Sequence, residues 1–444
     1  MTIIKPLLCF LLLLPFCGCK EEIARADPKI LTDQTLLHQN MDQLTQVIIH
    51  DMFSPPVASR IYAYTSLAVY EAIRFQQADH PSISAQLNGF TSMPVPEKNG
   101  DYNYLLAATK AFFTVAEKIT FSADTLNNYQ KKLYADFAFL LGEETFERSL
   151  LFGEAVGKKI LERTTGDNYK ATRGMPKNLG SNEPGKWRPT PPDYLDGGEP
   201  WWGKIKPLAV TSASQFTCPP PPAYSTDTNS AFYKTVDEVF LLGKSLSEEQ
   251  KTIARYWDDN PFVIEHSGHL MYGNKKITPV GHWIGITGIA CEKKNLSAVV
   301  TAQAYVLVST AVFDTFISCW EEKFKSALVR PVTVINELLD RNWQPYLQTP
   351  PFPEHSSGHS GISAAAATVL TKVFGDGFAF EDTSDLAYIG MKRTFRSFNE
   401  AAMEASISRV YGGIHYRTGI DAGATQGRDI GNYLLDKISL KGTE

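Results

Sequence analysis

The sequence predicts an all-α protein, a helical bundle, and three observations support this prediction. Apolar residues recur at three- and four-residue spacing over long segments, as they do on one face of an α-helix. Runs that alternate apolar and polar residues, which mark half-buried strands, are nearly absent. Helix-start signals also occur, such as Ser54 before Pro55-Pro56. The expected helices are 34–52, 57–75, 103–116, 123–141, 144–164, 230–242, 247–257, 295–320, 322–339, 357–374, 384–411 and 415–438.

One long stretch interrupts the helical pattern. Residues 172–228 are rich in proline, glycine and tryptophan and cannot form a continuous helix. Their aromatic residues favour a functional loop that packs onto the surface rather than a free linker. We therefore divide the chain into an N-terminal helical region (19–171), an irregular loop (172–228) and a C-terminal helical region (229–444) that carries the chemistry.

Charge excludes one class of function. The chain has 444 residues, with 43 Lys and Arg against 48 Asp and Glu, and its formal net charge is −5. It contains no run rich in lysine and arginine. Because binding to a phosphate backbone requires a basic face, we expect no nucleic-acid partner.

The first 18 residues read as a signal peptide. Lys5 precedes an apolar run, 6–16, that is shorter than the ~20 residues of a membrane span. Gly18 before Cys19 resembles the lipobox of bacterial lipoproteins, with Cys19 as the lipidated residue, and 20–22 is similar to the export tag of surface lipoproteins in the Bacteroidetes group. The alternative is an ordinary secretory signal. The lipobox implies a protein of the bacterial cell envelope, held at the outer membrane, and the tag implies exposure at the cell surface.

The rest of the chain contains no further apolar stretch long enough to span a bilayer, so we expect a protein anchored to the membrane by its lipid alone. Three cysteines remain after Cys19: Cys218, Cys291 and Cys319. At most one disulfide can form, and no disulfide framework holds the protein together.

The first chemical motif contains two cations. Lys323 and Arg330 stand seven residues apart on an expected helix, so both lie near one face and can converge on one anion. Pro331 tends to end the helix at Arg330. Two cations on one face are more often a solvated stripe, so this motif alone is weak evidence.

The second motif is Ser357-Gly358-His359, directly before an alanine-rich helical run. The N–H groups and dipole of a helix N-terminus attract an anion, and glycine lets the backbone approach it. His359 can donate or accept a proton at the same point. Taken alone, Ser357 could be only a helix cap and His359 a polar surface residue.

The third motif is Ser408-Arg409, followed five residues later by His415. The double glycine at 412–413 should end one helix before the next begins, which brings a guanidinium and an imidazole to a shared bend. Jointly, the three motifs supply three cations, a helix N-terminus and two imidazoles. These groups form a complete cradle for a tetrahedral oxyanion.

This order and spacing resemble the superfamily of type-2 phosphatidic acid phosphatases, bacterial acid phosphatases and vanadium-dependent haloperoxidases. The family places Lys, six residues and Arg-Pro before Ser-Gly-His, and then Ser-Arg, five residues and His. Two positions depart from the family pattern: Ser356 replaces the usual proline, and the acidic residue expected soon after the last histidine falls at Asp421. The second departure leaves open which carboxylate orients His415.

Further likenesses favour the haloperoxidase branch. Trp320 and Phe352 occupy positions similar to the aromatic lining of a halide pocket, and Asp259, within 256–260, is similar to a supporting partner of an arginine. The resemblance implies a helical bundle of the haloperoxidase and acid phosphatase type. It implies vanadate bound by Lys323, Arg330, Ser357, Gly358 and Arg409, with His415 as the ligand of vanadium and His359 assisting proton transfer. The implied reaction is halide oxidation by hydrogen peroxide.

Three alternatives remain open. An acid phosphatase would use the same cradle for a phosphomonoester or lipid phosphate without vanadate, with His415 as nucleophile and His359 as acid. A glycan-binding surface lipoprotein would not depend on Lys323, Arg409 or His415. The last alternative is a zinc site, for which the candidate ligands are His266, His269 and His282, although structural roles suit these three better.

Overall fold

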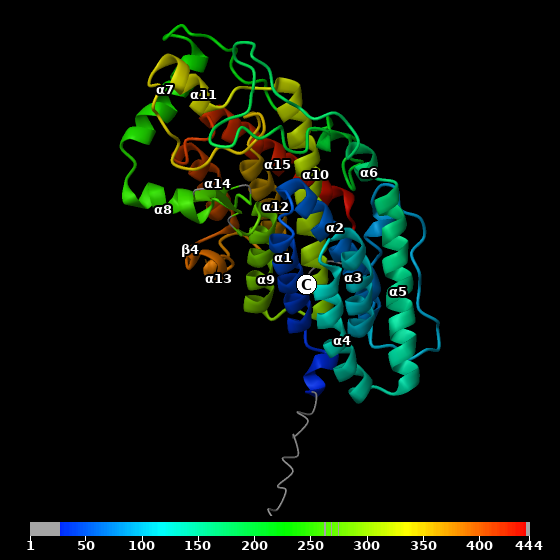
Figure 1. Ribbon diagram of the computed structural model, residues 1–444. Helices are drawn as coiled ribbons and strands as arrows, with labels where there is room; N and C mark the ends of the chain where they lie inside the picture. Colours follow the sequence, from blue (N-terminus) through cyan, green and yellow to red (C-terminus); the bar gives the residue numbers. More distant parts are fainter. Residues whose placement is uncertain (1–26, 262, 268, 274, 441–444) are drawn as a thin grey trace, which may run out of the picture.

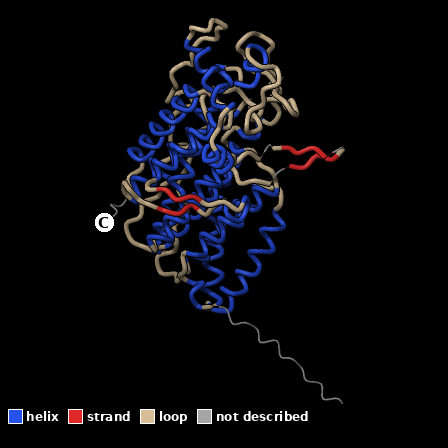
Figure 2. Tube along the Cα trace, turned by 90° about the vertical axis from the view of Figure 1, so that its left-hand side faces the viewer, coloured by secondary structure: helices blue, strands red, loops and turns tan. Residues whose placement is uncertain are grey.

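Helices are the main regular structure of the described residues (Figure 1). The structure, a computed structural model, describes residues 27–440 except 262, 268 and 274. Within these residues the only sheets are two short two-stranded antiparallel sheets, β1–β2 and β3–β4. Figure 2 shows the β1–β2 sheet projecting from the body and the β3–β4 sheet lying against the helices. The prediction of an all-α fold is therefore confirmed.

The elements have the following bounds. The helices are α1 (Thr35–His50), α2 (Pro55–Ile73), α3 (Tyr104–Ile119), α4 (Ala123–Leu140), α5 (Glu143–Thr165), α6 (Tyr169–Thr172), α7 (Ala231–Lys244), α8 (Glu248–Tyr256), α9 (Pro279–Lys294), α10 (Ala298–Ser326), α11 (Pro331–Leu338), α12 (Gly358–Phe374), α13 (Leu386–Ile389), α14 (Phe398–Tyr411) and α15 (Arg417–Lys437). The strands are β1 (Ile264–Ser267), β2 (Leu270–Gly273), β3 (Phe380–Asp382) and β4 (Arg393–Phe395).

Two helices, α10 and α12, occupy the centre of the bundle. α10 packs against α2, α9, α12 and α15, and α12 packs against α15, α10 and α14. By length and composition α10 could cross a membrane, which corrects the expectation that no such segment follows residue 19; its most apolar window is 94% buried inside the protein. A helix enclosed on all sides needs no polar face, which accounts for its composition.

The structure differs from the expected elements in three places. α9 was not predicted, because its residues are buried nearly all round and it lacks an amphipathic pattern. α10 continues to Ser326, where Ala327 adopts a left-handed conformation, so the helix does not break near residue 321 as expected. The expected helix 384–411 is in fact α13, β4 and α14 in succession.

The irregular stretch between α6 and α7 packs against the bundle. Asp314, buried on α10, accepts hydrogen bonds from the backbone N–H groups of Leu208, Ala209 and Val210 at 2.7, 2.6 and 2.9 Å. Trp187 and Trp202 from the same stretch are fully buried. Their indole rings and the Asp314 carboxylate tie the stretch to the core without regular structure.

The three cysteines after residue 26 are buried and unpaired. None of the described cysteines forms a disulfide, so apolar packing and hydrogen bonds hold the described fold together.

Candidate functional site

The three sequence motifs come together around one cavity. Gly358, His359, Arg409 and His415 all line it, and these residues come from α12, from α14 and from the bend between α14 and α15. Lys323 and Arg330 lie buried directly behind this lining, because both contact the segment 352–354 that joins the motifs. The fold therefore brings together residues that lie up to 92 positions apart in the sequence.

Lys323 and Arg330 do not share a helix, contrary to the prediction. α10 ends at Ser326, and Arg330 is the residue that precedes α11, with an extended backbone (φ −78°, ψ 152°). The side chains nevertheless converge: Lys323 Nζ donates to the carbonyls of Pro353 and Glu354 at 2.9 and 3.1 Å, and Arg330 Nε donates to the carbonyl of Phe352 at 2.8 Å. Pro331 fixes the break between the helices, and the break lets the two cations approach from different directions.

His415 is oriented by Glu354, a residue that the sequence analysis did not single out. Nδ1 of His415 lies 2.7 Å from Glu354 Oε1, and Arg330 Nη1 donates toward Nε2 at 3.1 Å. Because a carboxylate accepts only, the proton belongs on Nδ1 and the lone pair on Nε2. Asp421, the candidate from the family pattern, is exposed on α15. Glu354 could have been suspected only because it precedes the Ser-Gly-His motif.

Ser357, Gly358 and His359 form the start of α12, as the sequence predicted. Ser357 is the N-cap, and its Oγ accepts a hydrogen bond from the Ser360 N–H at 3.3 Å. His359 is hydrogen-bonded to the backbone of Asp258, and its Nε2 is buried without a partner among the described residues. A Cβ at Gly358 would lie 3.3 Å from the Trp320 ring, so glycine allows the close packing here.

Arg409 is anchored by backbone carbonyls. Its Nη2 donates to the carbonyls of Ala254 and Trp257, and its Nη1 donates to that of Asp258 at 3.4 Å. Asp259, expected as a partner of an arginine, lines the same cavity, but both of its carboxylate oxygens lie 3.1 Å from Nδ1 of His282. The charge of Asp259 therefore acts on Arg409 at longer range, where it favours the charged guanidinium.

The electrostatics of the site favour an anion. Burial lowers the pKa values of Lys323, Arg330 and Arg409, since each cation has lost its water. Burial also lowers the pKa of His415, and the nearby cations Arg330 and Lys323 lower it further. Arg330 Nη2 is buried and has no partner among the described residues. An oxyanion in the cavity would restore the lost hydrogen bonds and offset the desolvation of these cations.

An aromatic wall closes one side of the cavity. Trp320 and Phe352 pack with ring centroids 4.9 Å apart, and both line the cavity. Trp320 Nε1 donates to the carbonyl of Gly198 at 3.1 Å, which ties this wall to the irregular stretch. The Lys323 ammonium lies 5.6 Å from the Trp320 ring and 5.1 Å from the Phe352 ring, within the range of cation–π attraction.

The remaining candidates lie away from the cavity lining or outside the described residues. His266 is on β1 and His269 lies in the β1–β2 turn, whereas His282 is buried inside α9 between carboxylates, so the described contacts of His282 are those of an ion pair. Cys19 falls outside the residues that the structure describes.

Comparisons with known proteins identify a family model and solved structures that this chain resembles. The family described as the VCPO second helical-bundle domain matches residues 303–441, which include all three motifs. The chain is 44% identical to a bacterial vanadium-dependent iodoperoxidase of known structure, with a TM-score of 0.89, over 95% of this chain and 100% of that one. No curated protein matches the sequence.

More distant structures share the fold. The holo-type and apo-type structures of a bacterial vanadium-dependent chloroperoxidase match with TM-scores of 0.68 and 0.67 at 17% identity. They cover 87% and 86% of this chain and 93% and 94% of their own. The fold, the assembled cradle and the 44% identity over nearly the whole chain together lead to one conclusion. The protein is an enzyme that belongs to the vanadium-dependent haloperoxidase family.

Proposed function

We propose that this protein oxidises halide with hydrogen peroxide at a vanadate bound in the cavity, and that iodide is its preferred halide. One observation carries the proposal: Arg330 Nη2 and His359 Nε2 are buried without a partner among the described residues, His359 and His415 line a single cavity, and the lone pair of His415 Nε2 lies on the side of Arg330. The preference for iodide rests on the 44% identity to an iodoperoxidase.

The donor set suits a tetrahedral oxyanion with a metal at its centre. Lys323, Arg330 and Arg409 supply positive charge, and Ser357 with the N–H groups of the first turn of α12 supplies neutral donors. His415 supplies the nitrogen ligand, because Glu354 holds its proton on Nδ1. When bound, vanadate supplies a Lewis acid that polarises peroxide for attack by halide.

The chain's own residues account for the remaining steps. His359 stands at the cavity with a free Nε2, so it can take a proton from the incoming peroxide or return one to the leaving oxygen. Burial lowers the pKa of His359 well below its ordinary value, and the neighbouring Arg409 lowers it further, which keeps the ring neutral and leaves the lone pair of Nε2 unprotonated. Trp320 and Phe352 exclude water on the side where halide would approach.

The test pairs binding with turnover. Metal-free protein is titrated with orthovanadate, and dye halogenation by peroxide is then measured with iodide, bromide and chloride, with and without vanadate. Lys323→Met should abolish the vanadate-dependent activity. Lys325→Met is the matched control, because Lys325 lies on the same helix but its side chain is 63% exposed. Hydrolysis of a phosphomonoester without any vanadate-dependent halogenation would overturn the proposal in favour of the acid phosphatase.

The cellular location is a separate proposal. We propose lipidation at Cys19 and attachment to the outer membrane of the bacterial cell envelope, supported by the apolar run 6–16 and the Gly18-Cys19 pair. Metabolic labelling with a fatty acid should mark the wild type and leave Cys19→Ala unlabelled and released from membranes. A wild type that takes up no label would point instead to an ordinary secretory signal.

A further inference from the structure

One wall of the cavity is the short segment 257–260, which follows α8. Asp258, Asp259 and Asn260 line the cavity. The backbone carbonyls of Trp257 and Asp258 accept hydrogen bonds from Arg409, and the backbone of Asp258 also holds His359. Two of the residues that face the oxyanion are therefore positioned by the backbone of this wall. Any shift of the wall would move both.

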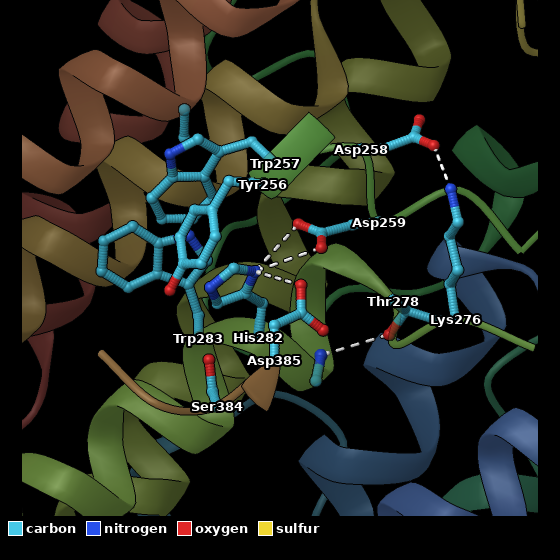
Figure 3. Close-up of polar contacts among 12 residues, drawn as sticks. Tyr256, Trp257, Asp258, Asp259, Lys276, Thr278, His282, Trp283, Ser384 and Asp385 are labelled. Carbon is cyan, nitrogen blue, oxygen red and sulfur yellow. Dashed lines mark hydrogen bonds and ion pairs between the residues drawn. The ribbon is translucent and has the colours of Figure 1, made fainter. Parts of the chain in front are cut away.

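A buried histidine on α9, His282, contacts this wall (Figure 3). His282 is fully buried, and its Nδ1 lies 3.1 Å from both carboxylate oxygens of Asp259. Its ring stacks on Trp257, with centroids 4.4 Å apart and an interplanar angle of 17°. The imidazole thus contacts the wall at two residues, Asp259 through an electrostatic contact and Trp257 through ring packing.

The other side of the same ring is anchored to a different part of the fold. Nε2 of His282 lies 2.9 Å from Asp382 Oδ2 at the end of β3. The second oxygen of Asp382 accepts hydrogen bonds from the Ser384 N–H at 3.0 Å and the Ser384 hydroxyl at 2.6 Å. Asp382 is therefore itself fixed, and His282 bridges it to the wall.

The charges indicate an imidazolium. Both ring nitrogens face a carboxylate, so each must carry a proton to donate. Burial on its own would lower the pKa of His282, but the carboxylates of Asp259 and Asp382 outweigh it and raise the pKa well above the ordinary value. A third carboxylate, Asp385, lies 3.9 Å from Nδ1. Asp259, His282 and Asp385 could alternatively surround a cation, which is a distinct outcome of the experiment below.

The backbone of Asp259 has an uncommon conformation. Asp259 has φ of +41°, in the left-handed region that residues with a side chain rarely adopt. Such a conformation persists only where the surroundings determine it, and it concentrates at functional sites. The described contacts of the Asp259 carboxylate that could impose it are those with His282.

We infer that His282 is a positioning residue for the oxyanion site: clamped between Asp259 and Asp382, it fixes the wall 257–260 so that this backbone holds Arg409 and His359 against the bound anion. The inference rests on the proposed function only in placing the oxyanion in this cavity. His282 itself touches neither the anion nor the halide.

The test compares two buried histidines. His282→Gln keeps a polar side chain of similar size but removes the charge, and His38→Gln is the matched control, because His38 is also buried and hydrogen-bonded, to the Tyr305 hydroxyl at 2.7 Å, far from the cavity lining. Calorimetric titration of the metal-free full chain measures the affinity for orthovanadate and, as a second probe, for inorganic phosphate. We expect His282→Gln to weaken vanadate binding at least about tenfold and His38→Gln to change it less than about twofold.

The kinetic constants kcat and KM give a second result, which a simple loss of stability would not produce. At saturating vanadate, His282→Gln should lower kcat while the KM for halide stays within about twofold, because the described ring contacts of His282 are with Tyr256 and Trp257 and not with the halide-side rings Trp320 and Phe352. Vanadate affinity equal to that of the wild type in His282→Gln would overturn the inference. If that variant does not fold, Asp382→Asn replaces it, since it keeps the ring and removes only the outer charge; unchanged affinity there would overturn the inference equally.

Two further outcomes distinguish this inference from a failure of the proposed function and from a cation site. A wild type that binds no vanadate would contradict the proposed function, and the phosphate affinities of the same variants would then decide the role of His282. Purified wild type that carries one equivalent of a divalent metal, lost in His282→Gln and in Asp385→Asn, would show a cation site and overturn the imidazolium clamp.

Discussion

Glu354 and His415, 61 residues apart in the chain, form a buried pair in which Glu354 Oε1 lies 2.7 Å from His415 Nδ1. The same oxygen also accepts the N–H of Tyr416 at 3.1 Å. Both side chains are almost completely shielded from water. This pair sets the tautomer that places a lone pair on Nε2 of His415, which accepts a hydrogen bond from Arg330 in this structure and would ligate vanadium in its place, so the integrity of the pair should decide how well the site holds vanadate.

Glu354→Gln should weaken vanadate binding by about ten- to a hundredfold, because the amide keeps the volume but removes the negative charge that makes His415 a better ligand. Equilibrium titration of the metal-free protein measures the change. Asp421→Asn is the control, since Asp421 is exposed on α15 and should leave the affinity unchanged. The reverse result, a loss in Asp421→Asn and none in Glu354→Gln, would show that the wrong carboxylate has been assigned.

Trp320→Phe should raise the KM for halide by about tenfold while vanadate affinity changes little. Phenylalanine keeps an aromatic ring beside Lys323 but loses the hydrogen bond from Nε1 to the carbonyl of Gly198, which holds the aromatic wall closed. Steady-state kinetics with varied halide measures the effect.

Trp201→Phe is the matched control for this wall, because Trp201 also donates Nε1 to a loop carbonyl, that of Pro176, at 2.7 Å. Equal changes in KM for the two variants would mean that the loop in general, and not the wall at Trp320, governs halide access.

The fold class and the seven motif residues could be predicted from the sequence because their signals are local. Helical periodicity and caps are read within one segment, and each motif occupies a few consecutive residues. Ser54, for example, is the N-cap of α2 as predicted. The spacing of Lys323 and Arg330 was informative even though the helix between them was not continuous.

The partners of these residues could not be predicted, because they depend on tertiary contacts. Glu354 lies in a segment without regular structure, and nothing local distinguishes its carboxylate from the exposed one of Asp421. The Asp259–His282–Asp382 bridge joins a loop, a helix and a strand end, and α9 itself lacked an amphipathic pattern. Burial on all sides removes the periodicity on which sequence prediction relies.

Gly427→Ala should destabilise the fold by about 1–3 kcal/mol or more. A Cβ at Gly427 would lie 1.9 Å from the carbonyl oxygen of Gly361, where α15 and α12 pack backbone against backbone, so the helices must separate. Urea denaturation measures the change in the free energy of unfolding. Gly174→Ala is the control, because nothing lies within 4 Å of its Cβ position and its stability should change little. Equal stability of both variants would contradict the close contact of α12 with α15.

The two buried histidines should impose opposite pH dependences on stability. Burial lowers the pKa of His38 to about 4, below its unfolded value of 6.5, so the unfolded state binds more protons. The stability that His38 contributes is present above pH 6.5 and is lost as the pH falls toward 4, by about 3 kcal/mol between pH 7 and pH 4. The pKa of His282 is instead raised well above 6.5, so its contribution is complete below pH 6.5 and is lost as the pH rises through the folded-state value.

Urea denaturation of the wild type, His38→Gln and His282→Gln at pH 5, 7 and 9 separates the two effects. Relative to the wild type, His38→Gln should gain stability as the pH falls from 7 to 5, because the variant lacks the imidazole whose protonation favours the unfolded state. His282→Gln should be most destabilised at pH 5, where the wild-type imidazolium is fully bridged by Asp259 and Asp382, and its deficit should shrink toward pH 9. A deficit in His282→Gln that stayed constant or grew with pH would mean that the ring is neutral in the folded protein, since a neutral ring cannot donate to carboxylates from both nitrogens.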